Sequence, residues 1–273
     1  MTTHGHPLLA RGALLVGAAL TTGCPNPVEG SASGDDSTSD ASTTGESSTG
    51  GTLATTGTVT SAASETDGTT DDSTTGDPLE PEAYGVWLKR EPPGAVCSNG
   101  SQYKFFVNFS ETSKNLLIYL EPGGACWDFE TCSGKASLGA ANPDGIPDSH
   151  MEKWGVLSPI LDRSVEDNPA RDWNLVFIPY CTGDVHTGNK VMTYEDPEGV
   201  EPPLTYRHNG HDNVARTIDY LSQQFPELGR MMVTGCSAGG AGSIINYYFF
   251  RNGLNPDRGY LLNDSGPIFP SEG

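Results

Sequence analysis

Residues 235–239 read Gly-Cys-Ser-Ala-Gly, a Gly-x-Ser-x-Gly pattern that can hold a nucleophilic serine in a tight strand-to-helix turn. The pattern follows a β-branched and apolar run at 231–234 and precedes an apolar helical run. In such a turn the serine hydroxyl stands above the sheet, and the amide of Ala238 points at the oxyanion that forms during acyl transfer. This context favours a functional Ser237 over a bystander serine in a glycine-rich turn.

A second oxyanion donor is expected from a loop after an earlier strand. Gly123 and Gly124 follow the apolar run at 116–120, where such a loop would lie. Glycines let main-chain amides approach a substrate closely. The alternative is an ordinary turn at the end of a strand.

The segments around these motifs predict strands that alternate with helices. Strands are predicted at 103–109, 116–120, 175–179, 231–234 and 260–262, and helices at 211–225 and from about 240 to 251. Alternation of this kind requires crossover connections. It predicts an α/β fold, a mostly parallel sheet flanked by helices, with functional loops at the carboxyl ends of the strands.

Five motifs resemble, in their order and rough spacing, those of the pectin acetylesterase/Notum family. They are residues 121–127, 155–158, 173–181, 235–240 and 263–266, and residues 94–101 are similar to the opening segment of that family. The resemblance covers residues 84–266. It implies an α/β-hydrolase fold and a serine carboxylesterase mechanism without a cofactor. It also implies substrates that are O-acyl esters on sugars or, in Notum, on a lipidated protein serine.

By position, the resemblance makes Ser237 the nucleophile and Gly123, Gly124 and Ala238 the oxyanion-hole donors. The sequence departs from the family after the glycine pair, where Ala125 replaces the usual aromatic residue and Trp127 lies two residues further on. We therefore expect an altered acyl pocket, and a small acetyl group as the acyl group removed.

A larger departure concerns the catalytic acid and base, which in this family follow the serine. None of the 36 residues after Ser237 is a histidine. Asp264 matches the Asp-Ser-Gly segment of the family, so we interpret it as structural or pocket-lining. His186, which follows a predicted strand, is interpreted as a loop residue in the pocket wall. A serine without a base is a weak nucleophile.

Two hypotheses follow from these departures. In the first, the chain is the N-terminal portion of an exported esterase, and its domain at 80–273 is incomplete after the strand that follows the nucleophile helix. The expected substrate is then an acylated carbohydrate or a small ester. In the second, the chain is a catalytically inactive surface protein that binds glycans. Either form should expose apolar surface near its last strand.

The residues before this domain predict a leader and a tether. Residues 1–24 combine Arg11 with a short apolar run, as in a signal peptide, and the segment that ends at Cys24 resembles a bacterial lipobox. Residues 25–79 are rich in Ser, Thr, Gly and Asp and predict a disordered tether. We expect an exported outer-membrane or cell-surface protein anchored to the membrane by a lipid on Cys24, with a plainly secreted protein as the alternative.

The net charge and the cysteines bear on which partners, disulfides and metal sites to expect. The net charge of −20 argues against nucleic acid as a partner. Export would permit disulfides, for which Cys126 with Cys132 and Cys97 with Cys181 are possible pairs. No Cys-x-x-Cys or histidine pair with ligand spacing is present, so no metal site is expected.

Overall fold

The computed structural model describes residues 83–136, 139–264 and 266. The predicted signal peptide at 1–24 and the predicted tether at 25–79 lie outside these residues, and so does Cys24. No helix in the described ranges is long and apolar enough to cross a membrane.

The centre of the fold is a six-stranded mixed sheet with the order β1-β2-β4-β3-β7-β8. The antiparallel pairs are β1 with β2 and β2 with β4, whereas β4, β3, β7 and β8 run parallel to one another. The strands are β1 (Trp87–Arg90), β2 (Phe105–Asn108), β3 (Leu116–Leu120), β4 (Asn174–Ile178), β7 (Arg230–Cys236) and β8 (Arg258–Asp264).

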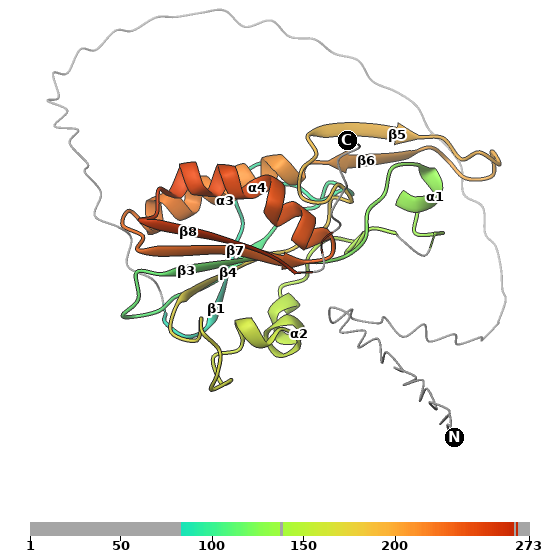
Figure 1. The fold of residues 1–273 in the computed structure, drawn as a ribbon. Helices are drawn as coiled ribbons and strands as arrows, with labels where there is room; N and C mark the ends of the chain where they lie inside the picture. The colour runs from blue at the N-terminus through green and yellow to red at the C-terminus, as the bar shows by residue number, and fades with distance from the viewer. Residues whose placement is uncertain (1–82, 137–138, 265, 267–273) are drawn as a thin grey trace, which may run out of the picture. The chain divides into compact units, whose positions relative to one another are not determined.

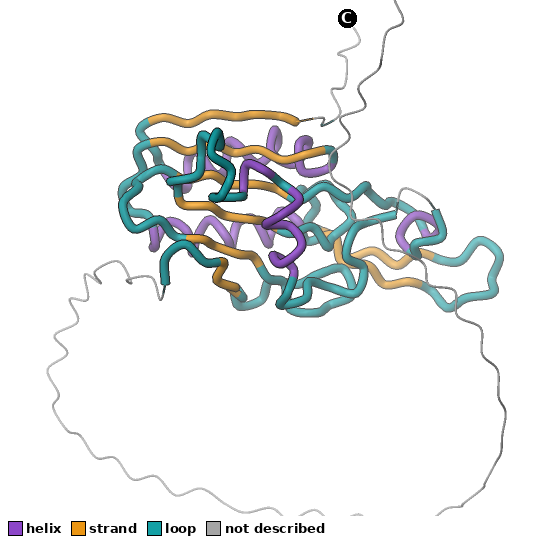
Figure 2. Tube along the Cα trace, turned by 90° about the horizontal axis from the view of Figure 1, so that it is seen from below, coloured by secondary structure: helices purple, strands orange, loops and turns teal. Residues whose placement is uncertain are grey.

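Helices cover both faces of this sheet. The long helices α3 (Gly210–Gln224) and α4 (Ala238–Leu254) lie on one face, and α2 (His150–Leu157) with the short 3₁₀ helix η1 (Pro159–Leu161) lies on the other (Figure 1). In the view from below, α2 is in front of the strands and the long helices are behind them (Figure 2). This is the α/β fold with a mostly parallel, helix-flanked sheet that the sequence predicted.

The core forms where the apolar runs of the sequence meet. Every residue of β2, β3 and β4 is buried, as expected for strands covered on both faces. Helix α3 turns its apolar stripe, which includes Val214, Ile218 and Leu221, toward this core. Helix α4 ends at Asn255, whose left-handed backbone is a common helix terminator, and Pro256 follows.

A smaller layer lies at the carboxyl end of the parallel strands. The segment after β3 leads into α1 (Phe129–Cys132), and the segment after β4 leads into an antiparallel hairpin of β5 (Lys190–Tyr194) and β6 (Leu204–His208) (Figure 1). Helix α1 is one turn long and is closed by a capping box between Asp128 and Thr131.

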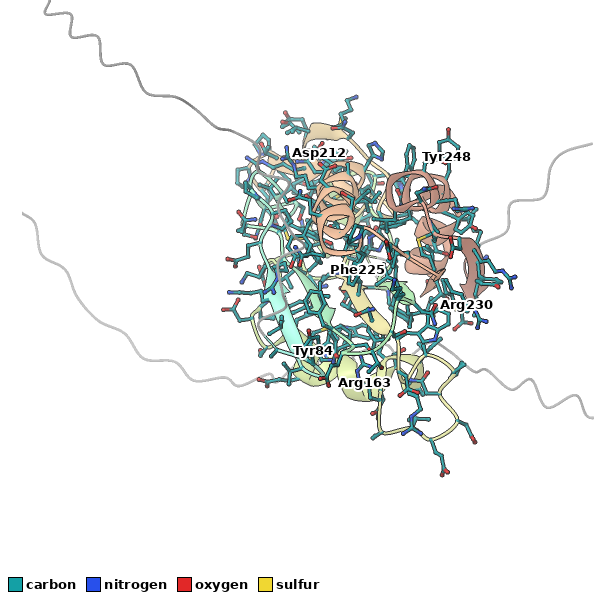
Figure 3. All side chains as sticks on the ribbon, turned by 90° about the vertical axis from the view of Figure 1, so that its left-hand side faces the viewer. Tyr84, Arg163, Asp212, Phe225, Arg230 and Tyr248 are labelled. Carbon is teal, nitrogen blue, oxygen red and sulfur yellow. A yellow bond between two sulfur atoms is a disulfide. The ribbon has the colours of Figure 1, made fainter. Side chains whose placement is uncertain are left out.

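Strand β8 is exposed over most of its length although its centre is apolar. Tyr260, Leu261 and Leu262 are 43%, 41% and 50% exposed, and they alternate between the two faces of the sheet. Helix α4 adds further exposed apolar side chains, including Tyr248, which lies on the outer side of the helix (Figure 3). Apolar surface near the last strand, which the sequence led us to expect, is therefore present.

Candidate active site

Ser237 occupies the single residue between the end of β7 and the start of α4. Its backbone has φ 52° and ψ −116°, a region that residues with a side chain rarely adopt. The strain of such a conformation is on the order of 1–3 kcal/mol and persists only where the surroundings enforce it. Two hydrogen bonds hold this turn: Ser237 N donates to Asp264 O at 3.1 Å, and Ala241 N donates to Ser237 O at 3.0 Å.

The two glycines of the motif are required by close packing against β3. A Cβ on Gly239 would lie 2.0 Å from the main-chain oxygen of Leu120, and a Cβ on Gly235 would lie 2.6 Å from the same atom. The added Cβ on Gly235 would also lie 2.5 Å from Gly239 O. The turn can therefore form only with glycine at both positions, because real Cβ atoms do not approach backbone this closely.

The turn places the start of α4 beside Ser237. The first amides of an α-helix, here beginning at Ala238, have no partner within the helix, and the helix dipole gives that end a positive potential. The Ser237 side chain does not cap the helix. An oxyanion formed next to Ser237 would therefore meet unpaired N–H donors.

The predicted second donor loop starts beside this turn. In the parallel register of β3 and β7, Leu120 lies opposite Gly235, so the chain leaves β3 next to the residues that lead into Ser237. Gly123 and Gly124 have φ +148° and +68°. Ala141 N donates to Gly123 O at 2.9 Å, and a Cβ on Gly123 would lie only 2.2 Å from the Ala141 side chain.

Glu121 fastens this loop to three other parts of the fold. Its carboxylate is buried, with 2% of the residue exposed, and accepts the Tyr180 N–H at 2.7 Å and the Asn142 side-chain amide at 3.1 and 3.2 Å. His150 Nε2 lies 3.1 Å from the same carboxylate. Several donors are what a buried carboxylate requires, because an unpaired one would be strongly destabilising.

Glu121 was not among the residues predicted from the sequence to be functional. The signal was present, because an acidic residue stands between a fully apolar strand and Pro122-Gly123-Gly124. A buried carboxylate at that position requires hydrogen-bond donors. The sequence alone does not identify the donors, which are Asn142, His150 and Tyr180.

His186 contacts the main chain of the same residue. Its Nε2 lies 2.9 Å from the main-chain oxygen of Glu121, and because a carbonyl can only accept, Nε2 is the donor. The imidazole is 2% exposed, and burial lowers its pKa. Its ring lies 4.6 Å from that of Tyr180, and Asn246 Nδ2 donates to its main-chain oxygen at 3.0 Å.

The described histidines are engaged elsewhere than at Ser237. His150 pairs with Glu121, His186 donates to Glu121 O, and His208 lies between Thr182 O and the Tyr194 hydroxyl. His211 packs against Phe249 with ring centroids 4.9 Å apart. Within the described ranges, no histidine side chain forms a hydrogen bond with the Ser237 hydroxyl.

The remaining predicted pocket residues lie in different settings. Ala125 is half-buried in the loop after the glycine pair, whereas Trp127 is 60% exposed. Asp264 is exposed at the end of β8 and contributes its main-chain oxygen to the Ser237 turn.

Two disulfides support the loops at this end of the sheet, and both pairs were possibilities in the sequence. Cys97 is bonded to Cys181, with Cα atoms 5.2 Å apart, and Cys126 is bonded to Cys132, with Cα atoms 4.9 Å apart. The first joins the chain near β1 to the exit of β4. The second closes the loop that carries Trp127.

A strand–serine–helix turn at the carboxyl edge of a mixed, helix-flanked sheet is the arrangement of an α/β-hydrolase-like protein. The family model for pectinacetylesterase matches residues 85–271. The chain belongs to that family.

Its relatives include pectin acetylesterases and Notum proteins. Pectin acetylesterase 4 of Arabidopsis thaliana is 33% identical over 64% of this chain and 43% of its own length. Palmitoleoyl-protein carboxylesterase notum2 of Xenopus laevis is 29% identical over 55% of this chain and 29% of its own length. The chain thus spans less than half the length of these relatives.

A solved structure of the Wnt deacylase Notum from Drosophila is similar to this one at a TM-score of 0.48. The two are 22% identical, and the match covers 68% of this chain and 56% of that one.

Proposed function

We propose that the protein is a carboxylesterase that removes O-acyl groups, acetyl above all, from a carbohydrate or a related ester. The observation that carries this proposal is the backbone of Ser237 at φ 52° and ψ −116°, held between β7 and the N-terminus of α4. That geometry is strained, and strained backbone of this kind concentrates at functional sites. Family membership adds the reaction class, because the relatives are named for ester cleavage.

In the proposed reaction Ser237 Oγ attacks the acyl carbonyl carbon and gives up its proton to a base. The carbonyl oxygen becomes an oxyanion next to the amides of Ala238, Gly123 and Gly124. The C–O bond to the sugar then breaks, the sugar leaves as an alcohol, and the acyl group stays on Ser237. Water attacks this acyl-enzyme, releases the carboxylic acid and restores the serine.

The family resemblance implies that the base is a histidine that follows the serine in chain order. The described histidines precede Ser237 and have other hydrogen-bond or ring partners, which supports leaving them out of this role. The same partners favour a second candidate function, binding of acylated glycans without catalysis.

Ala125 supports acetyl as the acyl group. Its methyl side chain is half-buried beside the glycine pair, at the position where the family usually has an aromatic residue. Acetate release from an acetylated polysaccharide, measured on protein purified from its native host, tests the proposal. We expect acetate release by the wild type and by Ser243→Ala, and none by Ser237→Ala. Ser243 is the control because its hydroxyl donates a hydrogen bond to Gly240 O within the same helix. Binding of the polysaccharide without release would favour the second function.

We further propose that the protein is exported and held at a membrane surface by a lipid on Cys24, with plain secretion as the alternative. The leader-like sequence at 1–24 and the two disulfides support export, since disulfides persist in oxidising compartments. Fractionation of cells that express Cys24→Ser tests the anchor. Movement of this variant from the membrane to the soluble fraction is expected, and its retention in the membrane fraction would contradict the lipid anchor.

A further inference from the structure

The fold brings His208 to the cysteine pair that closes the α1 loop. The ligand atoms of Cys126, Cys132 and His208 all lie within 4.8 Å of one another. The three residues are buried, with 5%, 6% and 8% of their surface exposed. Sequence spacing gave no sign of this group, because His208 comes from β6, far along the chain. Such a set of two sulfurs and one imidazole matches the ligands that zinc prefers.

His208 is oriented as a metal ligand would be. Its Nδ1 lies 2.9 Å from Thr182 O and must donate, because a carbonyl only accepts. The neutral ring therefore carries its lone pair on Nε2, which lies 2.9 Å from the Tyr194 hydroxyl. Metal-bound histidines usually donate the second ring N–H in this way, to a carbonyl or a carboxylate. Tyr194 is a half-buried residue of β5, and its hydroxyl donates a hydrogen bond to Nε2. A metal ion would replace this hydrogen bond at the same lone pair.

The elements that carry the three ligands are held in place by more than the S–S bond. Cys126 N donates to Gly183 O at 2.8 Å, which ties the α1 loop to the exit of β4. Thr131 and Asp128 cap α1 through reciprocal hydrogen bonds. His208 is paired with Lys190 across the β5–β6 hairpin. The sulfurs and the imidazole therefore stay near one another when the disulfide is opened.

A buried hydroxyl next to the group, which makes no well-formed hydrogen bond, is an independent sign of a polar occupant. Tyr206 is 3% exposed, and its OH makes no well-formed hydrogen bond among the described residues, although the Ser98 side chain interacts with it. A Cβ added to Gly183 would lie 2.6 Å from Cys126 Sγ and 2.9 Å from Tyr206 OH, so both atoms border the same small space. A buried hydroxyl without a partner is unfavourable. A metal-bound water there would supply the partner.

We propose that Cys126, Cys132 and His208 form, in the reduced protein, a three-ligand site for a zinc-type divalent ion, of which the disulfide is the oxidised and metal-free form. A dithiol or phosphine reductant supplies two electrons, and two protons complete the two thiols. Zn²⁺ then binds both thiolates and Nε2 and releases the two thiol protons. Zn–S and Zn–N bonds of about 2.3 and 2.0 Å require the ligand atoms to lie within about 4.6 Å of one another, close to the observed spread.

The test is a titration of the full-length chain with Co²⁺ under anaerobic conditions, before and after reduction by a phosphine. Tetrahedral thiolate-bound Co²⁺ gives visible absorption bands that identify its ligands. We expect one equivalent bound by the reduced chain and none by the oxidised chain. The Cys126→Ser/Cys132→Ser variant should lose the bands, and His208→Gln should weaken binding by about tenfold or more. The matched control, Cys97→Ser/Cys181→Ser, removes the other disulfide and should keep the bands, because it leaves Cys126, Cys132 and His208 in place.

A second measurement covers the case in which reduction loosens the fold. Binding to the folded state alone raises the melting temperature. Zn²⁺ should therefore raise the melting temperature of the reduced wild type, and at the same Zn²⁺ concentration it should raise that of reduced His208→Gln by less. The proposal is overturned if the reduced chain binds no Co²⁺, if the bands survive in the double serine variant, or if His208→Gln binds and melts like the wild type.

Discussion

The main-chain oxygen of Glu121 accepts a hydrogen bond from Nε2 of the buried His186 at 2.9 Å. The same residue uses its carboxylate to hold Tyr180 N and Asn142 Nδ2. Both polar ends of Glu121 are thus fixed, one residue after β3 and two residues before Gly123. This arrangement lets the fold, rather than a substrate, set the position of the loop that we propose as an oxyanion donor.

Replacing Glu121 by Gln should destabilise the protein. The amide would turn an NH₂ group toward donors that now meet a carboxylate, and the charge-assisted hydrogen bonds would be lost. We expect a loss of about 2–3 kcal/mol in the free energy of unfolding, measured by denaturant titration. Glu130→Gln, on the exposed side of α1, is the matched control and should change little. Equal stability of the two variants would contradict the structural role given to Glu121.

The burial of His186 predicts a pH dependence of stability. Burial lowers the pKa of His186 in the folded protein below the value near 6.5 of an unfolded chain. Below about pH 6.5 the unfolded state therefore binds more protons than the folded state, and stability falls as the pH drops through the folded pKa. Above about pH 6.5 His186 is neutral in both states, and its contribution to the free energy of unfolding is fully present.

Denaturant titrations from pH 7.5 downward measure this effect. His186→Gln keeps an N–H donor for Glu121 O but cannot titrate, so it should show a shallower loss of stability in acid than the wild type. His211→Gln, whose ring packs on Phe249, serves as the control and should keep the wild-type slope. An unchanged slope in His186→Gln would show that other groups carry the acid sensitivity.

The Ser237 turn should tolerate no side chain at Gly239. The Cβ of Gly239→Ala would lie 2.0 Å from Leu120 O, so β3 and α4 would have to move apart. We expect a loss of about 3 kcal/mol in the free energy of unfolding. In Gly229→Ala the nearest atom is the end of the Asn115 side chain at 3.2 Å, which can move, and the expected loss is under about 1 kcal/mol. Similar losses in both variants would refute the close packing of this turn.

The exposed strand β8 should promote self-association of residues 80–273. Its neighbouring apolar residues Tyr260, Leu261 and Leu262 lie on a strand that pairs, among the described strands, only with β7. Lysine on an edge strand opposes such association. Sedimentation should therefore show less association for Leu262→Lys than for Val200→Lys, a control on a surface loop that is 79% exposed. A monomeric wild-type segment with a sharp, cooperative melt would contradict this prediction.

Much of the sheet could be predicted because its strands are short apolar runs. Residues 116–120 were predicted as a strand and form β3, and the predicted helix at 211–225 is α3 within one residue. The strand–serine–helix order around Ser237 could also be predicted, because the sequence has a β-branched run before the serine and glycines on both sides of it. These are local patterns, and local patterns are what a single sequence records.

The missed features depend on contacts between distant residues. Strand β1 and the β5–β6 hairpin mix apolar with polar residues and are partly exposed, so no clear apolar period marks them. The role of Glu121 depends on hydrogen bonds with Asn142 and His150. The group of Cys126, Cys132 and His208 forms only because the hairpin folds back onto the α1 loop. The position of His186 against Glu121 O likewise follows from tertiary packing.

The most direct test of the central claim is the reaction of a fluorophosphonate with protein purified from its native host, followed by intact mass and peptide mapping. Such probes label serines that a base has activated. The account predicts one adduct per chain, on Ser237, absent from Ser237→Ala and present in Ser243→Ala. A folded protein that takes up no probe, or that is still labelled in Ser237→Ala, would contradict the assignment of Ser237 as the nucleophile.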